Sequence, residues 1–107
     1  MKYQVFMTPE ASEDLWDIYR FIWRNDGQHR ADRILAGLQE TCQSLTNFPG
    51  KGHLPPELDR IGVTGFLEVH YKPYRIIYQI TGKRVYIHAV LDGRRDMQEL
   101  LERRMIR

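Results

Sequence analysis

The chain has 107 residues, 42% of them hydrophobic and 28% charged, which is the composition of one ordinary globular domain spanning residues 1–107. No apolar run is long enough to span a bilayer, and the first twenty residues lack a cationic segment followed by an apolar one. We therefore expect no membrane partner. The single cysteine, Cys42, excludes an internal disulfide and fits a reducing compartment, so the expected location is cytoplasmic.

The formal net charge of +2 is concentrated at one end of the chain. Residues 1–92 contain eleven basic and eleven acidic side chains, whereas five arginines and three acids follow residue 92. A charge of this size does not indicate nucleic-acid binding by the whole chain. A basic tail, residues 91–107, could still steer an acidic partner.

The first half of the chain predicts one strand and two helices. Residues 2–7 alternate and are rich in strand-forming side chains. Thr8 and Pro9 then provide an N-cap and a favourable first helical residue, and apolar side chains recur at helical spacing up to Gly27. A second amphipathic helix is expected from Gln28 to before Pro49. Because the break between the helices is short, they should form a hairpin.

The second half predicts a long loop, three strands and a last helix. Residues 49–65 are rich in proline and glycine, and structureless loops of this length are unusual inside a compact domain. The strands are expected over residues 66–71, 74–80 and 84–91, with turns short enough to force antiparallel pairing. A short helix should follow over residues 96–104. The order β-α-α-β-β-β-(α) predicts an α+β fold, with a helical hairpin packed on one face of a mainly antiparallel four-stranded sheet.

Counting every second residue divides the last three strands into two faces. The apolar face, expected to meet the hairpin, comprises Leu67, Val69, Tyr71, Ile76, Tyr78, Ile80, Val85, Ile87, Ala89 and Leu91. The mixed face comprises Phe66, Glu68, His70, Arg75, Ile77, Gln79, Arg84, Tyr86, His88 and Val90. Only the charged tail is left to cover the mixed face.

The mixed face is where chemistry would be expected. Glu68, His70, Arg75, Tyr86 and His88 include a possible base, a possible acid and a cation suited to phosphate. Cleavage of RNA by its own 2′-hydroxyl requires such a set. The simpler interpretation is a solvated face of an antiparallel sheet, and we favour it because the five residues follow no spacing motif.

Two further groups are candidates for binding a partner. The tail arginines, which flank an apolar stripe, are Arg94, Arg95, Arg103 and Arg104. They suit an arm that docks on a partner, although surface ion pairs on a solvated helix, with the stripe docked on the domain itself, are the alternative. Trp16 and Trp23, one heptad apart, either pack at the margin of the first helix or, if exposed, mark a protein-binding surface.

Neither a metal nor a cofactor is expected. The four histidines show no metal-ligand spacing, and His70 and His88, predicted to share a face, lack a third ligand. The sequence contains no glycine-rich phosphate loop and no nucleophile elbow.

Four segments, taken in this order, resemble the RelE/ParE superfamily of toxins from bacterial type II toxin–antitoxin modules. They are TPEASEDLWDIYRFI, RADRILAGL, FPGKG followed by PEL, and PYRIIYQITGKRVYIHAVLDGRRDMQELL. The resemblance implies a growth inhibitor neutralised by a cognate antitoxin protein, with operator DNA contacted only through the antitoxin complex. The antitoxin would lie in an apolar groove with a polar rim, supplied by Trp16, Tyr19 and Trp23 or by the apolar side of the last helix.

The resemblance implies two alternative targets. RelE-like members enter the ribosome and cut mRNA, for which Arg75 would hold the phosphate beside Glu68, His70 and His88. ParE-like members poison DNA gyrase as protein inhibitors, without catalytic residues of their own. We favour gyrase, because residues 1–92 are neutral overall and the last helix lacks the tyrosine that RelE-like enzymes often place there.

In the favoured reading, the tail arginines, Trp16 and Trp23 contact gyrase, its DNA or the antitoxin. An inactive relative that only binds its antitoxin is a third alternative.

Overall fold

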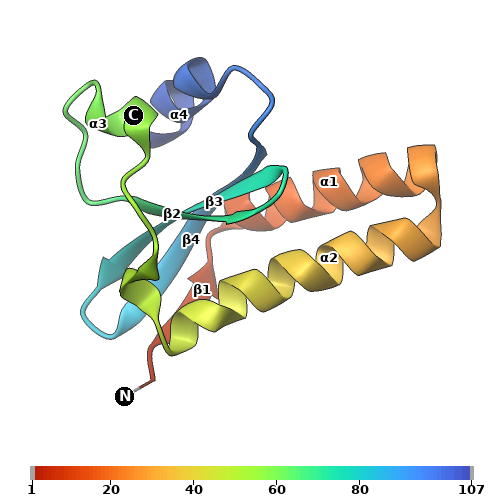
Figure 1. The fold of residues 1–107 in the computed structure, drawn as a ribbon, viewed down its shortest axis with the longest axis horizontal. Coiled ribbons are helices and arrows are strands. Elements are labelled where there is room, and N and C mark those ends of the chain that lie inside the picture. Colours follow the sequence, from red (N-terminus) through yellow and green to blue (C-terminus); the bar gives the residue numbers. More distant parts are fainter. Residues whose placement is uncertain (1, 107) are drawn as a thin grey trace.

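The computed structural model describes residues 2–106, and its elements follow the predicted order apart from one additional short helix before the second strand (Figure 1). The helices are α1 (Pro9–Asp26), α2 (Gln28–Gln43), α3 (Pro56–Asp59) and α4 (Met97–Met105), with short 3-10 turns η1 (Ser44–Thr46) and η2 (Pro49–Lys51). The strands are β1 (Gln4–Met7), β2 (Leu67–Tyr71), β3 (Tyr74–Thr81) and β4 (Arg84–Asp92). The predicted α+β class is confirmed.

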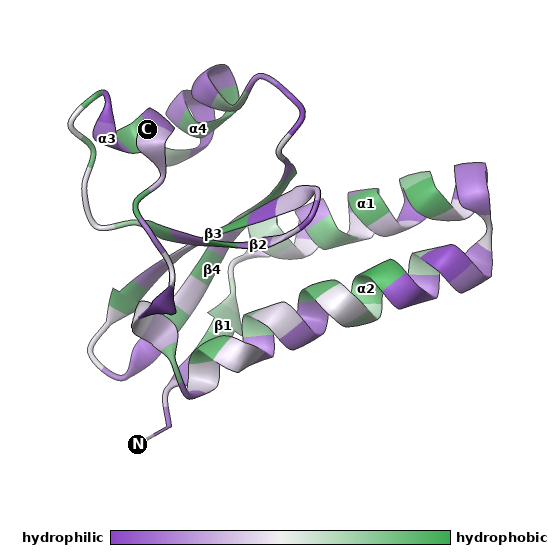
Figure 2. Ribbon diagram, viewed as in Figure 1, coloured by the Kyte–Doolittle hydropathy of each residue, from purple (hydrophilic) through white to green (hydrophobic). Residues whose placement is uncertain are grey.

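The α1–α2 hairpin begins and turns at the residues that the sequence indicated. The Thr8 hydroxyl accepts a hydrogen bond from the Ala11 amide at 3.2 Å and caps α1. Gly27, between the helices, has a φ of 92°, a conformation that a residue with a Cβ atom disfavours. Figure 2 shows hydrophilic residues at the tip of the hairpin, where α1 meets α2. The tip is therefore the part of the hairpin that extends into solvent.

The sheet has the strand order β1-β4-β3-β2. β1 is parallel to β4, while β3 pairs antiparallel with both β4 and β2. The short turns between the last three strands require the antiparallel pairs, whereas the hairpin carries the chain between the parallel ones. The prediction of a mainly antiparallel four-stranded sheet is confirmed.

A β-bulge interrupts the pairing of β3 and β4. Ile77 pairs with Ala89 and Tyr78 pairs with Ile87, so His88 is one extra residue on β4. An extra residue reverses the alternation of side chains in the part of the strand that follows it.

The bulge makes part of the predicted division into faces wrong. Ala89 and Leu91 were expected beneath the hairpin but pack in the cluster on the opposite face, and Val90 was expected opposite but packs beneath the hairpin. Counting every second residue assumes a regular strand, and the sequence gives no sign of the extra residue at His88.

The hairpin covers one face of the sheet and forms the larger apolar cluster. Its buried members are Ala11, Ile22, Ala31, Leu38, Cys42, Leu45, Val69, Tyr74, Ile76, Tyr78, Val85, Ile87 and Val90. The Tyr78 hydroxyl is satisfied inside this cluster, because it donates to the Pro49 carbonyl at 2.6 Å. This contact also fixes the start of the connection between the hairpin and β2.

The opposite face is covered by α3 and α4, which lie together on that side of the sheet in Figure 1. The buried members of this second cluster are Leu58, Ile77, Ala89, Leu91, Met97, Leu100 and Leu101.

The segment 49–65 is not structureless, since it contains η2 and α3. The apolar stripe of the tail packs on the chain's own sheet, as the alternative interpretation of the tail expected. None of the helices in residues 2–106 is long and apolar enough to cross a membrane.

Candidate functional site

Arg75, on β3, lies at the centre of an ionic cluster beside the second apolar cluster. Its Nη1 and Nη2 atoms donate to Glu57 Oε2 and Oε1 at 2.8 and 2.6 Å. Its Nε and Nη2 atoms donate to Glu68 Oε2 and Oε1 at 2.6 and 2.7 Å. We call Glu57, Glu68 and Arg75 the Arg75 cluster. Since one guanidinium faces two carboxylates, the ionised cluster carries one excess negative charge.

The side chains of the Arg75 cluster are largely buried. Side-chain exposure is 1% for Glu68, 14% for Arg75 and 15% for Glu57. The hydrogen bonds from Arg75 lower the pKa of the Glu57 carboxyl. The same bonds, that to Glu57 foremost, raise the pKa of Arg75, so the guanidinium stays charged. Both edges of the guanidinium are thus engaged by carboxylates.

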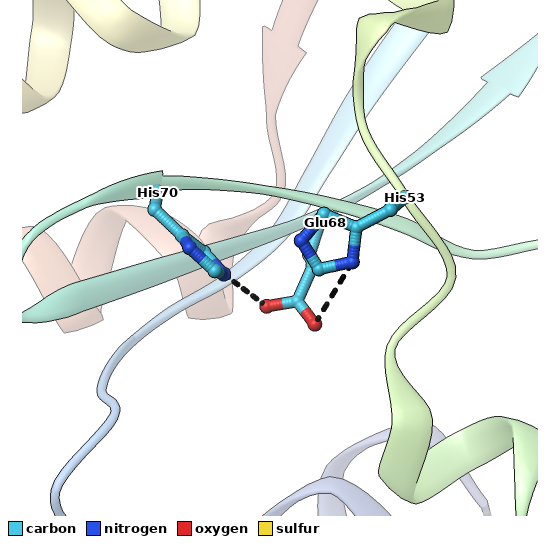
Figure 3. A group of neighbouring side chains, drawn as sticks. All are labelled: His53, Glu68 and His70. Carbon is cyan, nitrogen blue, oxygen red and sulfur yellow. Dashed lines mark hydrogen bonds and ion pairs between the residues drawn. The ribbon is translucent and has the colours of Figure 1, made fainter.

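Two histidines flank Glu68, as Figure 3 shows. His70 Nε2 lies 2.9 Å from Glu68 Oε2, and His53 Nδ1 lies 3.9 Å from Glu68 Oε1. The two imidazole rings meet edge to face with centroids 5.1 Å apart. Backbone hydrogen bonds of 3.0 and 2.8 Å between His53 and Glu68 hold the loop residue against β2.

The predicted set on the mixed face comes together only in part. Glu68, His70 and Arg75 are in contact, whereas His88 is bonded to a different group of residues. His88 Nε2 lies 3.1 Å from Gln79 Oε1, and burial lowers the pKa of its imidazole. Tyr86 stacks on Phe6 of β1, with ring centroids 5.6 Å apart.

Sequence reasoning missed His53 and Glu57, the two members of this site that come from the connection before β2. Glu57 lies on α3 and reaches Arg75 across the cluster, while His53 pairs with β2 through its backbone. The predicted loop gave these residues no expected position. Only the conspicuous length of the connection indicated that it had a role.

The four tail arginines have different environments. Arg104 Nη1 and Nη2 donate to the two Asp14 oxygens at 3.0 and 2.9 Å, and Nη2 also donates to the His88 carbonyl at 3.0 Å. Asp14 in turn accepts from the amide of Val90, just beyond the bulge, at 2.9 Å. Arg104 therefore ties α4 to α1 and β4.

The other three tail arginines are exposed. Arg94 donates to Asp92 at 2.9 and 2.6 Å and lowers the pKa of that carboxyl. Arg103 Nη1 lies 3.4 Å from Glu99 Oε1, one helical turn away. Arg95 is exposed and makes no side-chain ion pair within residues 2–106. These three cations are accessible to a partner.

A groove of about 540 Å³ lies between α1, α2 and β1. We call it the hairpin groove; it is lined by Val5, Met7, Ser12, Leu15, Trp16, Tyr19, Leu35, Gln39, Cys42 and Gln43. Trp16 is 54% exposed and stacks on Tyr19 with ring centroids 5.9 Å apart. Trp23, 51% exposed, lies outside the groove lining, on the neighbouring surface with Trp16, Tyr19 and Arg20. Burial raises the pKa of Cys42 to about 11, which makes this thiol a poor nucleophile.

A protein-family model matches most of this chain. Residues 5–97 match the family model described as the ParE toxin of the type II toxin-antitoxin system, parDE. A curated relative, Toxin ParE3 of Caulobacter vibrioides, is 30% identical over 94 residues, which cover 88% of this chain and 90% of the relative. The match to the family model ends where α4 begins.

Solved structures have the same fold. The chromosomal ParDE TA system from P. aeruginosa matches with a TM-score of 0.70 and 20% identity, covering 83% of this chain and 94% of that one. The toxin-antitoxin complex RelBE2 from Mycobacterium tuberculosis matches with a TM-score of 0.61 and 25% identity, covering 84% and 96%. The YoeB dimer from Staphylococcus aureus matches with a TM-score of 0.53 and 18% identity, covering 83% and 94%.

Proposed function

Since the chain belongs to the ParE toxin family of type II toxin–antitoxin systems, we propose that it inhibits growth by binding and poisoning DNA gyrase. A cognate antitoxin neutralises it, and operator DNA is contacted only through the complex of the two proteins. In this function the chain acts as a protein inhibitor and needs no catalytic residue of its own.

The pairing of Arg75 with two carboxylates is the observation that favours gyrase over the ribosome as the target. A ribonuclease of the alternative type would need a cation directed at a phosphate of the message. Arg75 instead makes four hydrogen bonds to Glu57 and Glu68, and the cluster has an excess of negative charge. This charge would repel a phosphate, which favours the protein-binding function over RNA cleavage.

The exposed tail arginines are the candidates for contact with gyrase or its DNA. Arg94 and Arg95 lie in the turn between β4 and α4, and Arg103 lies on α4, in the part of the chain that carries its net positive charge. Cations placed in this way increase the rate of encounter with an acidic surface. Arg104 is left out of this set because Asp14 and His88 already engage it.

The hairpin groove is the proposed antitoxin site. The apolar residues of α4 are buried against the sheet, so they offer no groove to a partner. The hairpin groove offers apolar walls with Ser12, Gln39 and Gln43 at its polar positions. This arrangement suits the apolar face of an antitoxin helix.

A supercoiling assay tests the target. Purified protein is added to relaxed plasmid, gyrase and ATP, and supercoiled and linear DNA are followed over time. The expected result is loss of supercoiling with accumulation of linear DNA. Normal supercoiling at a large excess of folded protein would exclude gyrase as the target.

Variants sharpen the same assay. Replacing Arg94, Arg95 and Arg103 together by alanine should reduce inhibition while the protein remains folded. Lys72→Ala, which removes an exposed cation from the β2–β3 turn, is the matched control and should inhibit as the unmodified protein does. Equal inhibition by the triple variant would remove the tail arginines from the proposed contact.

The alternative target is the ribosome with its mRNA. The exposed and adjacent imidazoles of His53 and His70 favour this alternative, because they could exchange protons with a substrate. Cleavage of mRNA on translating ribosomes, lost on replacing either histidine, would establish it. Normal growth of cells that overexpress the chain without antitoxin would indicate the third possibility, an inactive antitoxin-binding relative.

The antitoxin site is tested by binding of the purified cognate antitoxin. Trp16→Ala should weaken binding by about 2 kcal/mol or more, the cost typical of a buried aromatic anchor in an interface. Phe21→Ala is the matched control, because Phe21 is an exposed aromatic residue of α1 outside the groove lining. Equal losses in both variants would contradict the assignment of the hairpin groove. Trp23→Ala shows whether the interface extends along α1.

A further inference from the structure

Two imidazoles and one carboxylate come together at β2, although their residues follow no regular metal-binding spacing in the sequence. His70 and Glu68 lie two residues apart on the strand, while His53 comes from the connection before it. The three ligand atoms that they offer all lie within 4.8 Å of one another. Figure 3 shows both rings directed toward the carboxylate.

The spacing is close to what a metal ion requires. Zinc binds nitrogen and carboxylate oxygen at about 2.0–2.2 Å, so ligand atoms of a tetrahedral site lie roughly 3.3 Å apart. The distances are 2.9 Å from Glu68 Oε2 to His70 Nε2 and 3.9 Å from Glu68 Oε1 to His53 Nδ1. Small rotations of two exposed side chains, His53 at 61% and His70 at 42% accessible, would bring the three atoms to this separation and release His53 Nδ1 from the Leu54 carbonyl, 3.2 Å away.

Backbone hydrogen bonds and Arg75 fix the position of Glu68 relative to His53. His53 and Glu68 are joined by two backbone hydrogen bonds, and Glu68 is held by Arg75 with its side chain 1% exposed. The least mobile ligand is therefore the buried one, and the two histidines adjust around it. Such a fixed ligand reduces the entropy that is lost when an ion binds.

The local charge also favours a cation. Arg75 neutralises one of its two carboxylates and leaves one negative charge for the whole Arg75 cluster. Each ionised carboxylate oxygen has two lone pairs, so Glu68 can retain its bonds to Arg75 and still offer a lone pair. This hydrogen bonding orients the carboxylate in the way that outer partners orient metal ligands.

We propose that His53, Glu68 and His70 form a binding site for one divalent transition-metal ion of the zinc type. Two imidazole nitrogens with one carboxylate oxygen are a donor set that zinc accepts and that magnesium and calcium, which prefer oxygen, do not. The exposure of both histidines leaves the fourth position open to water. The ion would join the connection at His53 to the middle of β2.

This inference does not depend on whether gyrase is the target. It concerns a site beside the Arg75 cluster, whereas the hairpin groove and the exposed tail arginines are formed by other residues. Loss of metal binding and loss of gyrase inhibition are therefore separate results.

Calorimetric titration with zinc chloride tests the proposal. The protein should carry no histidine tag, be stripped with a chelator and be titrated at neutral pH, with magnesium chloride as the comparison ion. We expect one zinc ion per chain and no magnesium binding. His53→Ala and His70→Ala should each weaken zinc binding by more than the roughly 10–100-fold that loss of an outer hydrogen bond costs.

His29→Ala is the matched control, because His29 is exposed on the first turn of α2 and lies outside the site. It should bind zinc as the unmodified protein does. Zinc binding that is unchanged in both His53→Ala and His70→Ala would overturn the proposal, as would the absence of binding to the unmodified protein.

A second measurement uses the unmodified protein alone. The side-chain nitrogen resonances of His53 and His70 should shift in NMR spectra on addition of one equivalent of zinc, while those of His29 should not. Shifts confined to other histidines would contradict the site even if zinc bound somewhere on the chain.

Discussion

The two faces of the sheet are covered in different ways. The hairpin face is covered by two long helices over a continuous apolar cluster, and most of its members follow regular periodicity. The opposite face is covered by one turn of helix and one short helix, over a smaller apolar cluster. Charged side chains border that smaller cluster, with the Arg75 cluster and the Asp14–Arg104 pair among them.

The difference shows that polar residues on a strand need not be solvated. On the opposite face, Glu68 and Arg75 complete the packing of α3 against the sheet, because Glu57 of α3 reaches the same guanidinium. Arg104 likewise attaches α4 to the domain, because it binds Asp14 of α1 and the His88 carbonyl of β4. A small apolar area is supplemented there by buried ion pairs, which are costly to break once their partners are desolvated.

The largest expected loss of stability comes from breaking the Arg75 cluster. Arg75→Ala leaves the carboxylate of Glu68 buried without a cation, so it should lower the free energy of unfolding by about 3–5 kcal/mol in urea denaturation. Lys72→Ala, an exposed control two residues before β3, should change it by less than about 0.5 kcal/mol. A loss below about 1 kcal/mol for Arg75→Ala would show that the ion pairs contribute little.

Truncating one buried leucine in each apolar cluster to alanine compares how much the two clusters contribute to stability. Leu38 of α2 packs in the cluster between the hairpin and the sheet, Leu101 of α4 packs in the cluster on the opposite face, and both are 0% exposed. Leu38→Ala and Leu101→Ala should each cost about 2–5 kcal/mol of unfolding free energy, because each leaves a cavity. Leu54→Ala, at a 56% exposed position, is the control and should cost little. A negligible loss for Leu101→Ala would mean that α4 is only loosely attached.

A comparison of neighbouring arginines separates structural from accessible charges. Arg104→Ala removes two hydrogen bonds to a carboxylate that is 14% exposed, and should cost about 1.5–3 kcal/mol of unfolding free energy. Arg103→Ala removes an exposed pair and should cost about 0–1 kcal/mol. Equal losses in the two variants would contradict the distinct roles given to them here.

The smallest expected effect is a pH dependence that comes from His88. Burial lowers the pKa of this imidazole from its ordinary value of 6.5, so protonation is less favourable in the folded state than in the unfolded one. Stability is then unaffected above pH 6.5 and decreases as pH falls from 6.5 toward the folded pKa. Unfolding measured over this interval should show a shallower slope for His88→Gln. An unchanged slope would assign the dependence to other groups.

Local signals in the sequence predicted the fold. The Thr8 cap, the Gly27 break and the helical spacing between them specify the hairpin, and the short turns after Tyr71 and Thr81 specify the antiparallel strands. These features act over a few residues, so they can be recognised without knowledge of the tertiary structure.

The candidate site was harder to predict because its contacts join distant segments. Glu68, His70 and Arg75 were placed on one face by alternation, which the pairing of β2 with β3 confirms. His53 and Glu57 reach them only because the connection before β2 folds back on the sheet. No local pattern in a proline- and glycine-rich segment specifies such a path.

The bulge at His88 adds one residue to β4 relative to β3. Deleting this single residue would restore regular pairing with β3 and leave Ala89, Val90 and Leu91 facing the same clusters, because the residues on either side of His88 already pair with adjacent residues of β3. A relative whose strand is one residue shorter here can therefore keep the same pattern of buried side chains up to α4. An alignment that ignores the extra residue would instead pair buried positions with the wrong cluster.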